Sequence, residues 1–306
     1  MKKTYHLCLS EGDEVMFRDE EDYIRANNCL CLAAHKTETS LLAYSIMSNH
    51  VHIGVRTENP SKFISTFRYP YTRYFNNKYS RTGRLGEKQF FQLEIDGLYH
   101  LIAVIAYILR NPLHHGVAAT PFGYRYSSIG ALFQKEFGRF TEPELMMEKS
   151  AYLYLPEKTP LPYGFKMDKT GQILPESVID VADVEHIFST ARSFMFYMNR
   201  VSGEAWENEQ KQDITAMPPV TLSVIEQGSF DKDMKTLLSN EYGRGNYNKI
   251  TDLQLCEKID RVYLQGAKSV YSLSPREKAR IADVILQELR TTKEQIARCL
   301  GGDLKF

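Results

Sequence analysis

Two histidines separated by one residue, His50 and His52, are the side chains of this sequence whose types and spacing most directly suggest chemistry. They lie in the run from Tyr44 to Arg56, which is apolar and β-prone and therefore predicts a buried strand. Side chains two residues apart on a strand point to the same face, about 6.5–7 Å apart along the backbone. Two imidazoles placed in this way can bind one divalent ion and leave its other positions open, as in catalytic sites. The alternative is a strand that happens to carry two histidines.

A tyrosine and an amide, Tyr107 and Asn111, lie one helical turn apart at the end of a predicted helix over residues 97–110. Tyr107 lies off the apolar stripe of this helix. On a helix packed behind the histidine strand, the Asn111 carboxamide oxygen is a candidate third metal ligand and the Tyr107 phenol a candidate nucleophile. Periodicity alone favours an ordinary half-buried tyrosine. His114 and His115, just beyond, are interpreted as exposed residues at the helix end.

Basic and aromatic side chains are interleaved between residues 62 and 88. Single-stranded nucleic acid is bound by this combination, because cations contact its phosphates and rings stack on its unpaired bases. An amphipathic helix with an aromatic inner face and a solvated outer face explains about half of the same residues and does not exclude DNA binding. The candidate DNA contacts are Lys62, Arg68, Arg73, Tyr74, Lys78, Arg81, Arg84 and Lys88.

Composition is that of an ordinary globular protein, with 306 residues, 43% hydrophobic and 25% charged residues, and a formal net charge of zero. The whole chain therefore has no basic bias toward nucleic acid. The five cysteines form no CxxC pair, which is typical of reduced thiols in the cytosol. Neither a signal peptide nor a membrane-spanning run is evident, so we expect a soluble, cytoplasmic protein.

The elements that must position these residues are predicted from periodicity and turn signals. Acids in the first turn mark the start of the first helix, and Ser48-Asn49 links two strands into a hairpin. Pro70 is expected to kink or break the second helix, and Pro112 to end the third. The resulting order is a ferredoxin-like α+β fold, an antiparallel sheet with helices on one face. Its expected elements are strand 5–9, helix 19–34, strands 40–47 and 50–56, helix 60–79, strand 90–95 and helix 97–110.

Three regions are predicted along the chain: a first domain over residues 1–137, an irregular connection over 138–240, and a helical domain over 241–306. The connection contains a predicted helix near 183–200 and a loop near 203–219. In the last region, helices are expected at 275–289 and 292–300. The final helix resembles the beginning of a helix-turn-helix, but no full recognition helix follows before residue 306. A plain helical bundle is the favoured interpretation.

Four sequence blocks resemble the single-tyrosine HUH transposases, most closely their REP-associated branch. The resemblance covers residues 3–133, and its blocks are 46–53, 71–83, 106–116 and 124–128. It implies a ferredoxin-like HUH endonuclease domain, a divalent ion (Mg or Mn) on His50 and His52, and a nucleophilic tyrosine at Tyr107. It also implies a single-stranded DNA substrate read near a hairpin and cut through a 5′-phosphotyrosine intermediate. We expect the protein to be a monomer or a homodimer.

The chain departs from the family pattern at a few places. Gln89 stands where an arginine is expected, and the last ~170 residues match nothing in the core family pattern. Two alternatives stay open. One is a domesticated protein that binds DNA hairpins without cutting them. The other is a relaxase or replication initiator, whose histidine motif usually holds a further histidine that is not found near this pair in the sequence.

Overall fold

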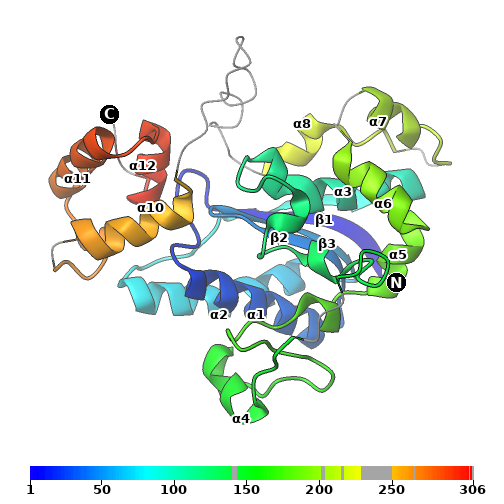
Figure 1. Ribbon diagram of the computed structural model, residues 1–306, viewed down its shortest axis with the longest axis horizontal. Coiled ribbons are helices and arrows are strands. Elements are labelled where there is room, and N and C mark those ends of the chain that lie inside the picture. Colours follow the sequence, from blue (N-terminus) through cyan, green and yellow to red (C-terminus); the bar gives the residue numbers. More distant parts are fainter. Residues whose placement is uncertain are drawn as a thin grey trace.

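A four-stranded antiparallel sheet forms the centre of the molecule, in the order β2-β3-β1-β4 (Figure 1). Its strands are β1 (Lys3–Ser10), β2 (Ser40–Ile46), β3 (His50–Thr57) and β4 (Phe91–Ile95). The computed structural model describes residues 1–139, 143–200, 204–214, 217–228, 250–264, 266–302 and 304. The order of strands and helices is that of the ferredoxin-like fold, so this prediction is confirmed.

The pairing of β1 with β3 decides which side chains share a face. Cys8 lies opposite His52, and His6 lies opposite Gly54. Because side chains alternate along a strand, both histidines of β3 share one face, while Val51 and Ile53 point to the other. Both central strands are almost completely buried, so the two faces are covered by different elements.

Helices α1 (Glu20–Lys36) and α2 (Pro60–Tyr79) pack together on the face opposite the histidines. Helix α1 begins with a capping box formed by Asp19 and Asp22. Helix α2 runs without a break through Pro70, so the expected break is wrong. Aromatic side chains spaced along the buried side of α2 anchor it before and after the proline; they are Phe63, Phe67, Tyr71 and Phe75.

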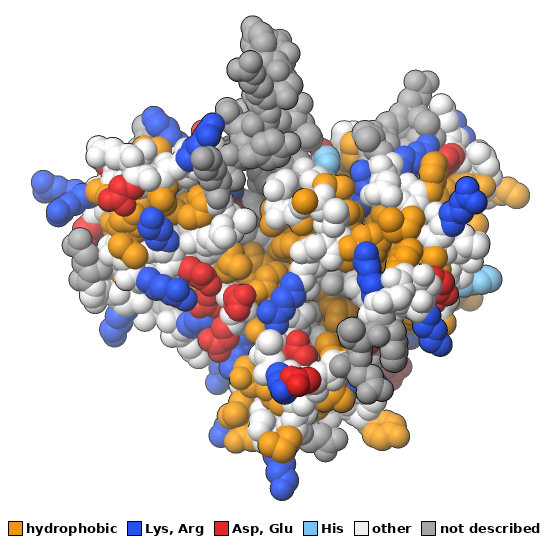
Figure 2. Space-filling model, in the orientation of Figure 1, with side chains coloured by type: hydrophobic (Ala, Val, Ile, Leu, Met, Phe, Trp, Pro, Cys, Tyr) orange, Lys and Arg blue, Asp and Glu red, His pale blue; other side chains and the backbone are white. Residues whose placement is uncertain are grey.

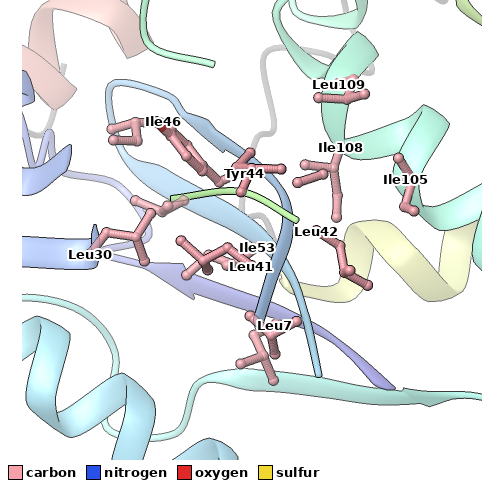
Figure 3. Close-up of a cluster of buried hydrophobic side chains, with 14 of the residues drawn as sticks. Leu7, Leu30, Leu41, Leu42, Tyr44, Ile46, Ile53, Ile105, Ile108 and Leu109 are labelled. Carbon is pink, nitrogen blue, oxygen red and sulfur yellow. The ribbon is translucent and has the colours of Figure 1, made fainter. Parts of the chain in front are cut away.

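Helix α3 (Leu98–His114) covers the histidine face of the sheet and packs on β2 and β3. The expectation that the helices lie on one face is therefore corrected for α3, which packs on the second sheet face through apolar contacts with β2 and β3. Figure 3 shows Ile105 and Ile108 of α3 beside Leu42. A Cβ on Gly54 would lie 3.3 Å from Ile108 Cδ1, so the glycine permits this close approach. The helix also continues through Pro112, which the sequence analysis took as its end.

Beyond the sheet, short helices α5 (Val181–Phe188), α6 (Ala191–Asn199), α7 (Glu204–Gln210) and α8 (Leu222–Ile225) follow a small helix, α4 (Glu148–Ala151). The single helix expected near 183–200 is two helices, because Ser189 has a φ of +63° and ends α5. Helix α7 occupies part of the expected loop near 203–219. Phe188, Phe194 and Ile225 belong to the same apolar core as the sheet.

The last region contains α10 (Asp252–Lys258), α11 (Pro275–Glu288) and α12 (Lys293–Cys299) around a second apolar core. This core docks on the loop before α1 through the fully buried Arg18. The guanidinium of Arg18 pairs with Asp260 at 2.7 Å and donates to the Cys299 carbonyl at 2.7 Å. Among the described residues no helix follows α12. Residues 241–249 of the predicted helical domain lie outside the described residues.

The five cysteines are buried and form no disulfide, which agrees with the absence of a CxxC pair. In the part of the chain that the structure describes, no helix has both the length and the apolar character needed to span a membrane.

Candidate active site around the histidine pair

His50 and His52 are buried side by side at the start of β3, with ring centroids 4.8 Å apart. Both rings point toward α3. Asn111, on the last turns of that helix, places its Oδ1 atom 3.1 Å from His50 Nε2. The structure therefore brings together the three residues that the sequence analysis proposed as metal ligands.

The Nδ1 atom of each imidazole makes a hydrogen-bond contact with a neighbouring side chain, and this contact fixes the position of the Nε2 atom. His50 Nδ1 lies 2.8 Å from Asn49 Oδ1, and His52 Nδ1 lies 3.0 Å from His6 Nε2. His52 Nε2 is buried and has no hydrogen-bond partner among the described residues. In metal sites, a histidine ligand almost always holds a hydrogen bond at its second nitrogen, which sets the tautomer. His52 Nε2 is thus available for an ion, and His50 Nε2 can share that ion with Asn111 Oδ1.

The contact between His50 and Asn111 also fits a cation. When neutral His50 donates its Nδ1 hydrogen to Asn49, its Nε2 presents a lone pair to Asn111 Oδ1, which is itself an acceptor. Asn111 Nδ2 is buried with no hydrogen-bond partner among the described residues. A positive ion between the nitrogen and the oxygen would satisfy both lone pairs. Among the described residues no group of three His, Cys, Asp or Glu side chains could hold a metal ion, and the Asn111 amide oxygen is the candidate third ligand.

His6 is a site residue that the sequence analysis missed. It faces the site because it lies opposite Gly54 on β1, and its ring stacks on His52 with centroids 5.1 Å apart. Burial lowers the pKa of His6 to about 3. Burial, followed by the neighbouring His50, lowers the pKa of His52 far below its ordinary value. Both imidazoles are therefore neutral at pH 7 and keep a lone pair, as metal binding requires.

The Tyr107 ring packs against these histidines. Its ring centroid lies 5.2 Å from that of His52 and 6.1 Å from that of His6. Only 4% of the side chain is exposed. Tyr107 and Asn111 lie one turn apart, so α3 presents the candidate nucleophile and the candidate amide ligand on one side.

His114 and His115 were expected to be exposed at the helix end, but they are half-buried against the site because α3 extends further than expected. The His115 ring lies 5.1 Å from that of His50, and the His114 ring lies 6.2 Å from that of Tyr107. His114 Nε2 is also 2.9 Å from Glu226 Oε1. Glu226, far along the chain, carries no local motif, so only the structure reveals it.

The candidate DNA contacts of α2 are separated from the histidines by the sheet. Lys78 is held by three carboxylates, and it lies 2.7 Å from Asp19, 3.2 Å from Glu21 and 2.9 Å from Asp22. The Tyr74 hydroxyl donates to the same Asp22. These side chains are therefore engaged within the molecule.

Three members of the candidate set lie in the loop after α2. The loop after α2 returns to the histidine end of the sheet, where Glu87 N donates to the carbonyl of Ser10. In this loop Arg84 and Lys88 are exposed, whereas Arg81 pairs with Glu11 at 2.7 Å.

On α2, Lys62 is exposed, Arg68 donates to the Glu87 carbonyl, and Arg73 pairs with Glu157. Figure 2 shows Lys and Arg side chains scattered among acidic ones on the visible face.

Comparison with known proteins shows which family the N-terminal region resembles. Residues 2–111 match the family model described as "Transposase IS200 like", and this region contains both histidines, Tyr107 and Asn111. The N-terminal region of the chain is therefore similar to the IS200-like transposases, and this match agrees with the superfamily predicted from the sequence blocks.

Comparison with solved structures gives a distant match. A REP-associated tyrosine transposase bound to a REP hairpin has 14% sequence identity and a TM-score of 0.37 to this chain, covering 47% of this chain and 84% of that one. No curated protein matches the chain.

Proposed function

We propose that this protein is a metal-dependent single-stranded DNA endonuclease and strand transferase of the REP-associated tyrosine transposase type. The observation that supports this most is the position of Tyr107 beside His52, in a buried cluster that also contains His50 and Asn111. A nucleophile beside a set of metal-competent donors is the arrangement that phosphoryl transfer needs.

The metal in this proposal is Mg or Mn, held by His50 Nε2, His52 Nε2 and Asn111 Oδ1. Bound to the scissile phosphate, it would make phosphorus more electrophilic and stabilise the charge of the transition state. Imidazole ligands bind Zn or Ni more tightly than Mg or Mn.

The covalent step belongs to Tyr107. Its phenol oxygen attacks the phosphorus of a phosphodiester, forming an O–P bond as the bond to the 3′ oxygen breaks. The phenol proton leaves, and the 3′ oxygen takes up a proton to become a free hydroxyl. The products are a 5′-phosphotyrosine and a 3′-OH end. The linkage keeps the energy of the phosphodiester, so another 3′-OH can attack it and rejoin the strand without ATP.

The DNA in this proposal is single-stranded and forms a hairpin near the cut. Exposed cations at the histidine end of the sheet, Arg84 and Lys88, are suited to its phosphates. Because Tyr107 lies beside His52 of the same chain, the structure favours attack by a tyrosine on its own subunit's site, whether the protein is a monomer or a homodimer.

A direct test is to incubate the full chain with labelled single-stranded hairpins and Mn and to look for a covalent protein–DNA adduct on a denaturing gel. Wild-type protein should form an adduct that survives denaturation and requires the metal. Hairpin binding without any adduct, under conditions where the metal is shown to bind, would instead identify a non-cutting hairpin-binding protein.

A further inference from the structure

Helix α3, which carries Tyr107, has no cap of its own at its N-terminus. Its N-cap residue is Gly97, with a φ of +96°, and no side chain near it in sequence accepts from the first turn. The first amides of a helix have no partner within the helix and need an acceptor. Here the acceptor comes from a residue more than a hundred positions later, Asp213.

Asp213 caps α3 with both oxygens of its carboxylate. Tyr99 N donates to Oδ1 at 3.0 Å, and His100 N donates to Oδ2 at 2.9 Å. The side chain of Asp213 is only 5% exposed. A Cβ on Gly97 would lie 2.4 Å from Asp213 Oδ2, so glycine at this position makes room for the cap. A carboxylate here also interacts favourably with the positive end of the helix dipole.

The C-terminal end of α3 also contacts the part of the chain that contains Asp213. Glu226, just after α8, accepts from His114 Nε2 at 2.9 Å. His114 packs edge-on to Tyr107 at a centroid distance of 6.2 Å. Thus one acid contacts the first turn of α3, and a second acid contacts the last turn beside the tyrosine.

The two acids belong to one folded unit. Helix α7 packs along α3, and its last residue, Gln210, is buried. Gln210 Nε2 donates to the Val220 carbonyl at 2.9 Å, and Val220 N donates to Gln210 Oε1 at 2.7 Å. This pair of hydrogen bonds joins α7 to the stretch that leads into α8. We call the described residues of 204–228 the brace.

We propose that Asp213 and Glu226 are positioning residues, through which the brace holds the tyrosine helix so that Tyr107 stays against His52. This inference rests on the proposed function and assigns a role to a region outside residues 2–111 that match the transposase model. A displacement of a reacting group by about 1 Å can cost on the order of 100-fold in rate. A helix carrying both the nucleophile and an amide ligand therefore needs both of its ends fixed.

The test compares Asp213→Ala, which removes the cap, with Asp213→Asn, which keeps one acceptor oxygen and a good capping residue. Asp180→Ala is the matched control, since Asp180 caps α5, which carries no site residue. Glu226→Gln tests the other end of the helix. Each variant is made in the full chain, and adduct formation, hairpin binding and hydrogen exchange along α3 are measured.

We expect Asp213→Ala to lower the rate of adduct formation by at least about tenfold, with hairpin affinity unchanged, and Asp213→Asn to recover most of that rate. In Asp213→Ala, the rate of hydrogen exchange should rise by about tenfold at the backbone amides of Tyr99 and His100. It should also increase at the amides near Tyr107. Glu226→Gln should lower the rate of adduct formation less than Asp213→Ala does. Asp180→Ala should behave as wild type.

Two outcomes would overturn the proposal. One is a wild-type rate of adduct formation in Asp213→Ala. The other is faster exchange confined to Tyr99 and His100, which shows a local cap without control over Tyr107. If wild-type protein forms no adduct, the proposed function fails, and the exchange near Tyr107 alone decides whether the brace positions the helix.

Discussion

His52 Nδ1 lies 3.0 Å from His6 Nε2, across two paired strands, in a fully buried contact between two neutral imidazoles. One of the two nitrogens must donate and the other accept. When His52 donates, its Nε2 carries the lone pair that a metal needs. In this arrangement His6 accepts from His52 and supports the tautomer of His52 that a metal requires.

Replacing His6 should weaken metal binding even though His6 contacts no metal in this arrangement. We expect His6→Ala to lower Mn affinity by about 10- to 100-fold, the usual effect of losing such a partner. Titration of Mn followed by electron paramagnetic resonance measures this directly. His35→Asn, which changes an exposed histidine outside the site, controls for weak metal binding by ordinary histidines. Equal Mn affinity in His6→Ala and wild-type protein would contradict this role.

Tyr107→Phe should abolish both cleavage and the covalent adduct, because no other group supplies the attacking oxygen. Folding and hairpin binding should change little, since the ring is retained. Tyr99→Phe is the matched control on the same helix, about 12 Å away along its axis. It should leave the adduct intact.

His50→Ala should also lose cleavage, but through loss of the metal. Excess Mn should restore part of the activity of His50→Ala and none of the activity of Tyr107→Phe. A Tyr107→Phe protein that cuts DNA at the wild-type rate would show that a different residue, or water, attacks the phosphate.

Acidification should destabilise the fold through the buried histidines. The pKa of His6 is lowered from 6.5 to about 3, so below about pH 6.5 the unfolded chain binds more protons than the folded chain. The free energy of unfolding therefore rises with pH in this window. We expect His6 to cause a loss approaching about 1.4 kcal/mol for each pH unit between about pH 6 and pH 4.

Urea unfolding of wild type and His6→Gln between pH 4 and pH 7 isolates this contribution. The comparison is needed because burial raises the pKa of Asp22 to about 6, which makes stability fall as the pH rises through nearly the same range. The stability of wild type relative to His6→Gln should decrease as the pH falls. A pH-independent difference between the two proteins would refute the prediction.

Lys78 and Arg84 should have different roles, although both belong to the basic stretch. Lys78→Met leaves the buried Asp22 without its cation, and we expect a loss of roughly 2–3 kcal/mol of stability. Arg84→Ala should leave stability unchanged and weaken DNA binding. Its slope of log affinity against log salt should fall by about 0.7, the value for one phosphate contact on a single strand.

Urea unfolding together with hairpin binding at several salt concentrations separates these effects. If Lys78→Met weakens binding in the native protein and reduces the salt slope as Arg84→Ala does, then Lys78 also contacts DNA. In that case α2 would belong to the DNA-binding surface despite its place behind the sheet.

The sequence determined the parts of this protein that depend on local periodicity. Strand alternation put His50 and His52 on one face, and the helical repeat put Tyr107 and Asn111 one turn apart. These relationships depend on backbone dihedrals within a few residues, so they can be deduced without knowing the rest of the fold. The order of the first seven elements followed in the same way.

Only the tertiary structure decided which distant residues complete the site. The register between β1 and β3 brought His6 to His52, and the packing of α3 on the second sheet face, beside Gly54, brought Asn111 to His50. Long-range pairing likewise neutralised Lys78 and placed Asp213 at the start of α3. These contacts join residues separated by roughly 50 to more than 100 positions, and their partners are selected by burial, register and charge compensation, which no local pattern contains.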